Sequence, residues 1–200
     1  MYKKFRRILF VVVAGLFVVA LAPGAGAAKG EGSRGKPSVE MASYNGAVVS
    51  MDVVWDSAQA CLVWPEMLES PECFDSEEEM DRRVESLEQQ SGSLVQSDGL
   101  NGGVVMYSAS SCSSYLRLYD GTSYTGSALY LRTRAQWFNL SSLGFDQRTS
   151  SFKIGACSAY FADYSNGGGS WYPTSATQAY DVATSMISGW NNDVSSVYIT

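Results

Sequence analysis

The stretch WNNDVSSVYI, residues 190–199, decides the fold of this chain. Adjacent amides and a pair of serines lead into a run of β-branched and aromatic residues, a pattern that predicts an oxygen-rich turn followed by a strand. A second copy, FDQRTSSFKI, occupies residues 145–154, and a glycine precedes each copy, Gly144 and Gly189. A turn that occurs twice at a fixed offset indicates an internal repeat.

An aromatic corner precedes each turn. Residues 118–126 read LYDGTSYTG, and residues 160–169 read YFADYSNGGG. Both combine an aromatic strand, an acidic residue, a second aromatic residue and a glycine at which the chain can fold over sharply. Short β runs alternate with Gly, Ser, Asn and Thr turns from residue 112 onward, which predicts an antiparallel sandwich. Each half carries enough short strands for one four-stranded Greek key.

At these residues the chain resembles the βγ-crystallin domain. That domain has two Greek keys, each with an aromatic-x4-aromatic-x-Gly corner and then a turn of the form [Asn/Asp]-[Asn/Asp]-x-x-[Ser/Thr]-Ser. Tyr119, Tyr124 and Gly126 match the first corner, whereas the second corner, around Phe161 and Gly168, is looser. The resemblance implies a C-terminal βγ-crystallin-like sandwich and a mainly β chain.

The two turns match this pattern unequally. Residues 191–196 fit at every position, and residues 146–151 depart once, at Gln147. The resemblance covers residues 112–200. Within it, residues 136–145 are similar in texture to the secreted microbial branch of the fold, which includes inhibitors of metalloproteinases. Inhibition of an extracellular protease is therefore the alternative function, and a secreted toxin or cell-wall-associated binding protein is a second alternative.

The resemblance also implies two calcium sites. In the family, the third residue of each turn gives a carbonyl, the fifth gives a hydroxyl, and an acidic corner from the other repeat completes the site. Carried over by position, one site would use the Asp193 carbonyl, the Ser195 hydroxyl and Asp120, and the other the Arg148 carbonyl, the Ser150 hydroxyl and Asp163.

Oxygen-only ligands suit a hard cation such as calcium. One carboxylate per site predicts weak binding, with a dissociation constant of roughly 10⁻⁴ to 10⁻³ M. The alternative is that Ser150 and Ser195 only hydrogen-bond the folded turn, as turn hydroxyls commonly do. We expect weak calcium binding that stabilises the fold.

Residues 41–107 differ in composition and predict a small α+β segment. Residues 47–55 and 61–64 have strand propensity, and residues 104–107 follow with another short strand-like run. Residues 76–90 predict a helix that begins with a Ser76–Glu79 capping box. Its acidic face would either bind a cation or partner or, as a solvated helix, cover a small sheet.

Four cysteines in an exported chain predict two disulfides. Three connectivities are open, and we favour Cys61–Cys73 with Cys112–Cys157 because each pair stays within one compositional segment. Their spacing is not that of a cysteine metal site.

Residues 1–27 predict a signal peptide, with a basic start, an apolar run and a small-residue exit. A membrane anchor is the alternative, but the apolar run is short for a span. Residues 28–40 predict a flexible leader. Cleavage would remove four basic residues and take the formal net charge from −6 to −10. Such an acidic chain is not expected to seek nucleic acid, and we expect a secreted monomer without a stable membrane anchor.

The chain has no histidine. This excludes Ser-His-Asp and Cys-His catalysis and histidine-ligated zinc, and we expect no enzymatic activity. A carboxylate pair such as Asp146 and Asp163 could in principle act in hydrolysis, but nothing in the sequence fixes their separation. The aromatic residues Trp137, Trp171, Tyr172 and Trp190 would either line a sugar or protein surface or fill the core.

Overall fold

A computed structural model describes residues 38–94, 115–174 and 176–200. The predicted signal peptide, nearly all of the predicted leader, the predicted strand at residues 104–107 and Cys112 lie outside these residues. Within the described ranges, no helix is both long and apolar enough to cross a membrane.

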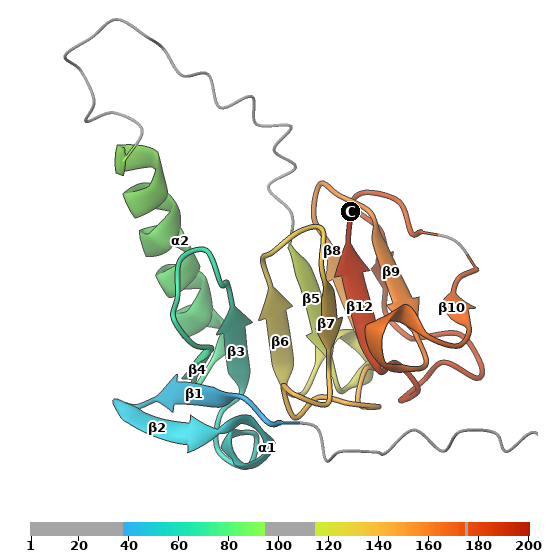
Figure 1. Cartoon of the computed structure of the whole chain (residues 1–200), viewed down its shortest axis with the longest axis horizontal. Helices are drawn as coiled ribbons and strands as arrows, with labels where there is room; N and C mark the ends of the chain where they lie inside the picture. Colours follow the sequence, from blue (N-terminus) through green and yellow to red (C-terminus); the bar gives the residue numbers. More distant parts are fainter. Residues whose placement is uncertain (1–37, 95–114, 175) are drawn as a thin grey trace, which may run out of the picture. The chain divides into compact units, whose positions relative to one another are not determined.

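Two β-sheets form the framework (Figure 1). The larger sheet has the strand order β11-β8-β5-β6-β3-β4-β1-β2, and the smaller has the order β10-β9-β12-β7. The elements are β1 (Met41–Tyr44), β2 (Ala47–Ser50), α1 (Met51–Val54), β3 (Ala60–Val63), β4 (Glu72–Phe74), α2 (Glu77–Leu94), β5 (Leu116–Tyr119), η1 (Thr122–Tyr124), β6 (Ala128–Leu131), β7 (Trp137–Asn139), β8 (Ser151–Ile154), β9 (Ala159–Ala162), η2 (Ser165–Gly167), β10 (Trp171–Tyr172), β11 (Val182–Ala183) and β12 (Ser196–Ile199).

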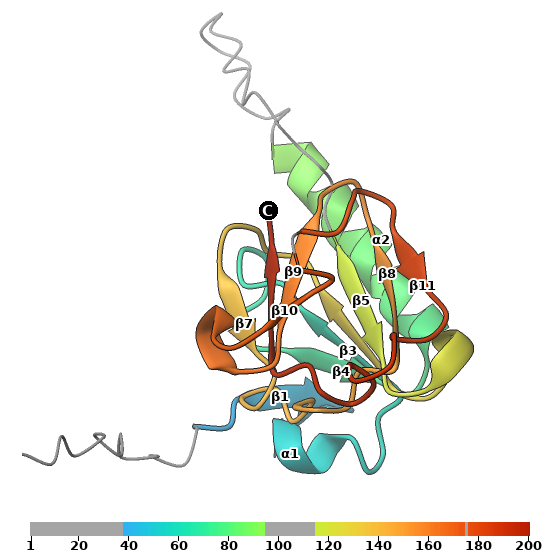
Figure 2. The same ribbon diagram turned by 90° about the vertical axis from the view of Figure 1, so that its right-hand side faces the viewer.

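The two repeats exchange their third strands. Strands β5 to β8 belong to the first repeat and β9 to β12 to the second, but β7 pairs with β12 and β11 pairs with β8. Both pairings are antiparallel, so each sheet contains three strands of one repeat and the third strand of the other. Figure 2 shows the smaller sheet and β11 from the side. This exchange confirms the predicted mainly β class and the two-Greek-key sandwich.

The N-terminal α+β segment shares the larger sheet. Strand β3 runs parallel to β6, with Ala60 opposite Ala128 and Val63 opposite Leu131. Strands β4, β1 and β2 then extend the sheet beyond β3. A disulfide joins Cys61 on β3 to Cys73 on β4, as predicted. The sandwich and the segment before it are therefore connected by backbone hydrogen bonds.

The predicted strand at residues 47–55 is wrong in its second half. Strand β2 ends at Ser50, and the short helix α1 follows over Met51–Val54. Met51 and Val54, three positions apart, are both buried, whereas Val53 is exposed. That spacing places two side chains on one face of a helical turn. The β-branched residues of this stretch favour a strand by propensity, but packing of Met51 and Val54 into the core decides otherwise.

Helix α2 confirms the predicted helix and extends it to Leu94. Its first turn is capped as predicted, since the Glu79 backbone N–H donates to the Ser76 hydroxyl at 3.2 Å. Three side chains along one stripe of the helix are buried against Ala60 and Tyr130 of the sheet, and these are Met80, Val84 and Leu87. Figure 1 shows the helix beside β3 and β4.

The acidic face of α2 contacts basic residues of the sandwich. Arg117 on β5 donates to Glu77 at 3.2 Å and to Asp81 at 2.7 Å, and Arg132 pairs with Glu88. Burial lowers the pKa of the Arg117 guanidinium, but the hydrogen bond and charge of Asp81 more than offset it, so that the pKa is raised overall. These contacts agree with the interpretation of α2 as a cover for the sheet.

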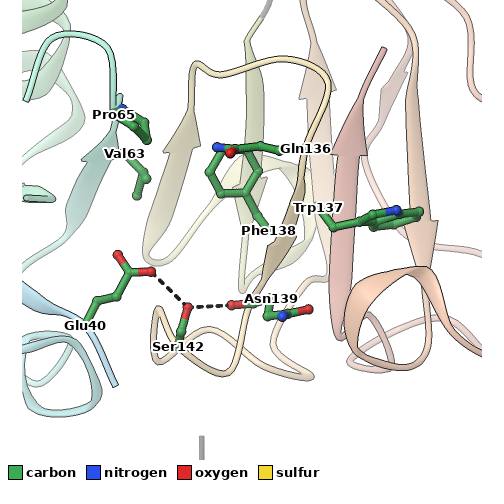
Figure 3. A pocket seen from close by; sticks show the side chains of 8 residues that line it. All are labelled: Glu40, Val63, Pro65, Gln136, Trp137, Phe138, Asn139 and Ser142. Carbon is green, nitrogen blue, oxygen red and sulfur yellow. Dashed lines mark hydrogen bonds between the residues drawn. The ribbon is translucent and has the colours of Figure 1, made fainter. Parts of the chain in front are cut away.

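The start of the described chain holds the loop that follows β7. The Glu40 backbone N–H donates to the Ser142 carbonyl at 2.8 Å, and the Ser142 hydroxyl donates to the Glu40 carboxylate at 3.1 Å (Figure 3). A half-open depression of about 330 Å³ lies here, between β7 and residues Glu40, Val63 and Pro65. Glu40 is the one acidic side chain of its lining, and Ser142 already engages it.

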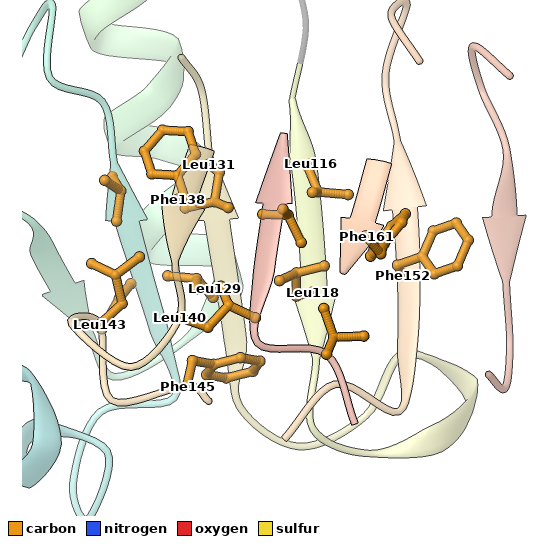
Figure 4. Close-up of a cluster of buried hydrophobic side chains, with 14 of the residues drawn as sticks. Leu116, Leu118, Leu129, Leu131, Phe138, Leu140, Leu143, Phe145, Phe152 and Phe161 are labelled. Atoms are coloured by element: carbon orange, nitrogen blue, oxygen red, sulfur yellow. The ribbon is translucent and has the colours of Figure 1, made fainter. Parts of the chain in front are cut away.

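The core lies between the two sheets. Figure 4 shows side chains of the larger sheet, the leucines of β5 and β6 and Phe152 of β8, together with Phe138 of β7 and Phe161 of β9 from the smaller sheet. The labelled members are Leu116, Leu118, Leu129, Leu131, Phe138, Leu140, Leu143, Phe145, Phe152 and Phe161, and each is at most 8% exposed. Full burial of one such side chain stabilises the fold by about 1.5–3 kcal/mol. Strand β7 alternates half-buried and buried residues, as expected of a sandwich, whereas β6 is buried at all four positions because α2 packs on its other face.

Candidate functional site

The two oxygen-rich turns hold each other. The Gln147 backbone N–H donates to the Val194 carbonyl at 3.0 Å, and the Asn192 N–H donates to the Thr149 carbonyl at 3.0 Å. These bonds join the second position of each turn to the fourth position of the other. Gln147 and Asn192 also share a left-handed backbone, with φ of 54° and 58°. The turns are therefore related by an approximate two-fold axis.

The last serine of each turn fixes the corner of its own repeat. The Ser151 hydroxyl donates to the Gly121 carbonyl at 2.6 Å and accepts from the Tyr124 N–H at 3.1 Å. Ser196 donates to the Tyr164 carbonyl at 2.6 Å and accepts from the Gly167 N–H at 2.9 Å. Both hydroxyls thus satisfy backbone groups of a 3₁₀ turn, η1 or η2.

Each corner also has an acidic residue that closes it. The Asp120 carboxylate accepts from the Ser127 N–H at 2.7 Å, and Asp163 accepts from the Ser170 N–H at 2.7 Å. A glycine with positive φ lies against each carboxylate, and a Cβ there would approach it to 2.1 Å at Gly126 and 1.8 Å at Gly169. The corner glycine of the second repeat is therefore Gly169, which corrects the assignment of Gly168.

The second corner matches the pattern less well because its second aromatic residue is replaced by glycine, and an aromatic side chain from another strand lies there. In the first corner Tyr124 packs on Tyr119, with ring centroids 5.6 Å apart. Gly167 occupies the equivalent position in the second corner, where a Cβ would lie 2.2 Å from the Trp137 ring. Trp137, on β7 of the first repeat, fills the space. Sequence reasoning missed this role because Trp137 is distant in the chain from the corner it completes.

The turns differ most at their third residue. The Arg148 guanidinium donates to the Asp120 carboxylate at 2.6 Å and to the Gly144 carbonyl at 3.2 Å. Asp120, assigned from the sequence to the turn that holds Ser195, thus contacts the turn that holds Ser150. In the second repeat, Asp193 occupies the position of Arg148, and Asp163 occupies the position of Asp120. The first repeat pairs opposite charges where the second has two carboxylates.

The fifth residues differ as well. The Ser150 hydroxyl donates to the Asn192 side-chain oxygen at 3.0 Å, a second link between the turns. The equivalent partner of Ser195 would be Gln147, the residue that departs from the family pattern. Among the described residues, no hydrogen bond is recorded for the Ser195 hydroxyl, although the residue is only 7% exposed. Both hydroxyl oxygens keep their lone pairs, but only Ser150 is already oriented by a hydrogen bond to a protein group.

These donor sets suit a cation unequally. In the first turn, Arg148 neutralises Asp120 and Asn192 engages Ser150. The second repeat has the unengaged Ser195 hydroxyl and carries carboxylates, Asp163 and Asp193, at the sequence positions equivalent to Asp120 and Arg148. Oxygen ligands of this kind are those that calcium prefers. In the described part of the chain, no group of three or more Asp, Glu, His or Cys side chains lies together in a way that could hold a metal ion. A cation at the second turn would rely on hydroxyl and carbonyl oxygens as well as carboxylates.

The remaining predicted residues divide between core and surface. Cys157 is disulfide-bonded, but its predicted partner Cys112 lies outside the described residues. Tyr172 packs against Trp190 with ring centroids 5.5 Å apart, on the core side of the smaller sheet. Trp137 and Trp171 contact each other at 5.9 Å and remain partly exposed.

Comparisons with known proteins identify solved structures of βγ-crystallin domains. A βγ-crystallin from Ciona intestinalis is 17% identical over 43% of this chain and 99% of that one, with a TM-score of 0.36. A domain from Flavobacterium johnsoniae is 22% identical over 42% of this chain and 92% of that one, with a TM-score of 0.34. An archaeal βγ-crystallin is 18% identical over 44% and 99%, with a TM-score of 0.34. No family model and no curated protein matches the sequence.

Proposed function

We propose that this chain is an exported, non-enzymatic βγ-crystallin-like protein whose second turn binds calcium weakly and is stabilised by it. The observation that supports this proposal is the difference between the turns. The Ser195 hydroxyl is unengaged within the described residues, while Ser150 already donates to Asn192. The second repeat also places Asp163 and Asp193 where the first has the Asp120–Arg148 ion pair.

Calcium would be held by the Asp193 carbonyl and the Ser195 hydroxyl, with the Asp163 carboxylate supplying charge. Asp163 takes the place of Asp120 in this proposal because Asp120 is bound to Arg148. When bound, calcium would neutralise the two carboxylates and cross-link the turn to its corner. With a dissociation constant of roughly 10⁻⁴ to 10⁻³ M, calcium at ten times that concentration adds about 1.4 kcal/mol of stability.

Thermal unfolding tests this proposal with a matched pair of variants. Millimolar calcium should raise the Tm of the mature chain and of Ser150→Ala. It should not raise the Tm of Ser195→Ala, because only this substitution removes a proposed calcium ligand. Magnesium at the same concentration is the control, since it demands a stricter octahedral geometry. A Tm of the unsubstituted chain that does not respond to calcium would remove the proposal.

Export is supported by the cysteines. Cys61 and Cys73 form a disulfide and Cys157 is disulfide-bonded, as is usual in oxidising compartments. Secretion is tested by recovering the chain from the medium, cleaved after residue 27. Inhibition of an extracellular metalloproteinase stays the alternative prediction, and a stoichiometric assay against a protease panel tests it.

A further inference from the structure

We propose that Arg148 is a resident cation of the first turn. Its guanidinium neutralises the Asp120 carboxylate, which a metal ion would otherwise neutralise, so the first repeat is closed to calcium. Arg148 supports the N-terminal segment instead. The inference concerns residues of the first turn only, and it does not depend on whether the second turn binds calcium.

The guanidinium is held from several sides. It donates to the Asp120 carboxylate at 2.6 Å and to the Gly144 carbonyl at 3.2 Å. It also lies over two aromatic rings, with centroid distances of 5.0 Å to Phe145 and 5.4 Å to Trp55. The Arg148 and Asp120 side chains are only 31% and 24% exposed. A planar, fixed cation in such a place replaces the charge that a hard metal would bring to the corner.

The N-terminal segment covers the same turn. The Trp55 indole N–H donates to the Leu143 carbonyl at 2.9 Å, and its ring packs on Phe145 at 5.1 Å. At Gly144 a Cβ would lie 2.2 Å from the Met51 carbonyl oxygen, so helix α1 touches the turn backbone. At the equivalent Gly189, a Cβ would meet no atom within 4 Å. Trp55 belongs to the N-terminal segment and Asp120 to the first corner, so Arg148 joins the two.

The charge of Arg148 makes this closure permanent. An arginine side chain does not lose its proton in proteins. A divalent cation entering the first turn would face that charge at short range and would compete with it for the Asp120 carboxylate. The Ser150 hydroxyl donates its proton to Asn192 and keeps its oxygen lone pairs, so the obstacle to calcium is Arg148 and not this hydrogen bond. Calcium would therefore have to displace the ion pair between Arg148 and Asp120.

Calcium stoichiometry tests the inference directly. Arg148→Ser should bind one more calcium equivalent than the unsubstituted chain, measured by isothermal titration calorimetry, with a dissociation constant of roughly 10⁻³ M. Arg148→Lys, which keeps the charge, should gain none. Adding Asp120→Asn to Arg148→Ser should abolish the gain. An unchanged stoichiometry in folded Arg148→Ser, or an equal gain in Arg148→Lys, would overturn the inference.

A second measurement needs no substitution at Arg148. In a calcium titration of the unsubstituted chain followed by amide NMR, the resonances of Asp120 and of Ser127, whose N–H donates to the Asp120 carboxylate, should not shift with saturation behaviour up to tens of millimolar, a range chosen above the weak-site affinities. Saturating shifts at these amides would overturn the inference even if Arg148→Ser fails to fold. If the unsubstituted chain binds no calcium but Arg148→Ser gains a site, the proposed function fails and the inference stands.

Discussion

The two turns of this protein have the same backbone conformation and differ in the residues that surround them. Each donates its second N–H to the fourth carbonyl of the other, and each uses its last serine to hold a corner. The first turn, however, is covered by Trp55 and α1, whereas Gly189 of the second turn has open space beside it. The repeat therefore specifies the backbone frame, while single side chains decide what each copy can bind.

Two further pairs of equivalent positions carry the difference. Phe145 of the first turn is fully buried, and its counterpart Trp190 is half-buried. Arg148 pairs with Asp120, and its counterpart Asp193 is another carboxylate. Substitutions at equivalent positions can therefore separate what the shared frame contributes from what the surroundings contribute.

The largest difference is expected at the aromatic pair. Phe145→Ala removes a fully buried ring that packs on Trp55 and should lower the free energy of unfolding by about 3–5 kcal/mol. Trp190→Ala should cost less, because Trp190 is half-buried and packs mainly on Tyr172. Urea unfolding without calcium measures both. Equal losses would show that the cover over the first turn adds nothing.

The glycine pair should differ next. Gly144 and Gly189 both have positive φ, so alanine at either should cost about 1–2 kcal/mol in backbone strain. Gly144→Ala should cost more, because the new Cβ would meet the Met51 carbonyl oxygen at 2.2 Å. Chemical denaturation of the two variants gives the difference. A Gly189→Ala variant that is the less stable one would contradict the view of an open second turn.

The serine pair should show no difference. Ser151 and Ser196 are both fully buried, and each satisfies one carbonyl and one N–H of its corner. Alanine at either leaves those groups unsatisfied and should cost about 1–3 kcal/mol. The two losses, measured by thermal unfolding, should be similar, because the two serines make the same kinds of bonds. A clear inequality would mean that the corners are not equivalent.

The smallest effect is expected at the fifth position in the absence of calcium. Ser150→Ala removes the hydrogen bond to Asn192 and should cost about 1 kcal/mol. Ser195→Ala removes a hydroxyl with no recorded partner among the described residues and should be nearly neutral in a chelator. Denaturation in a chelator, repeated in calcium, separates the two. A large loss for Ser195→Ala in the chelator would indicate a structural role.

Much of the fold could be predicted because its determinants are local. The corner at Tyr119 to Gly126, the helix capped by Ser76 and the pairing of Cys61 with Cys73 depend on residues close in the chain. The parallel pairing of β3 with β6 was not predicted, since no local pattern encodes a partner so distant in sequence. The ion pair of Asp120 with Arg148, in place of a contact between Asp120 and the second turn, likewise depends on the folded corner and not on a local pattern.

The pairing of β3 with β6 has a consequence for how the chain is made. Ala60 finds its neighbour Ala128 only after the ribosome has added the whole intervening segment. Until then one edge of this apolar strand has no partner, which is the situation in which nascent chains associate with one another. The Cys61–Cys73 crosslink holds β3 to β4 on the other side. In an oxidising compartment this disulfide can form before β6 is available and hold β3 in a hairpin with β4.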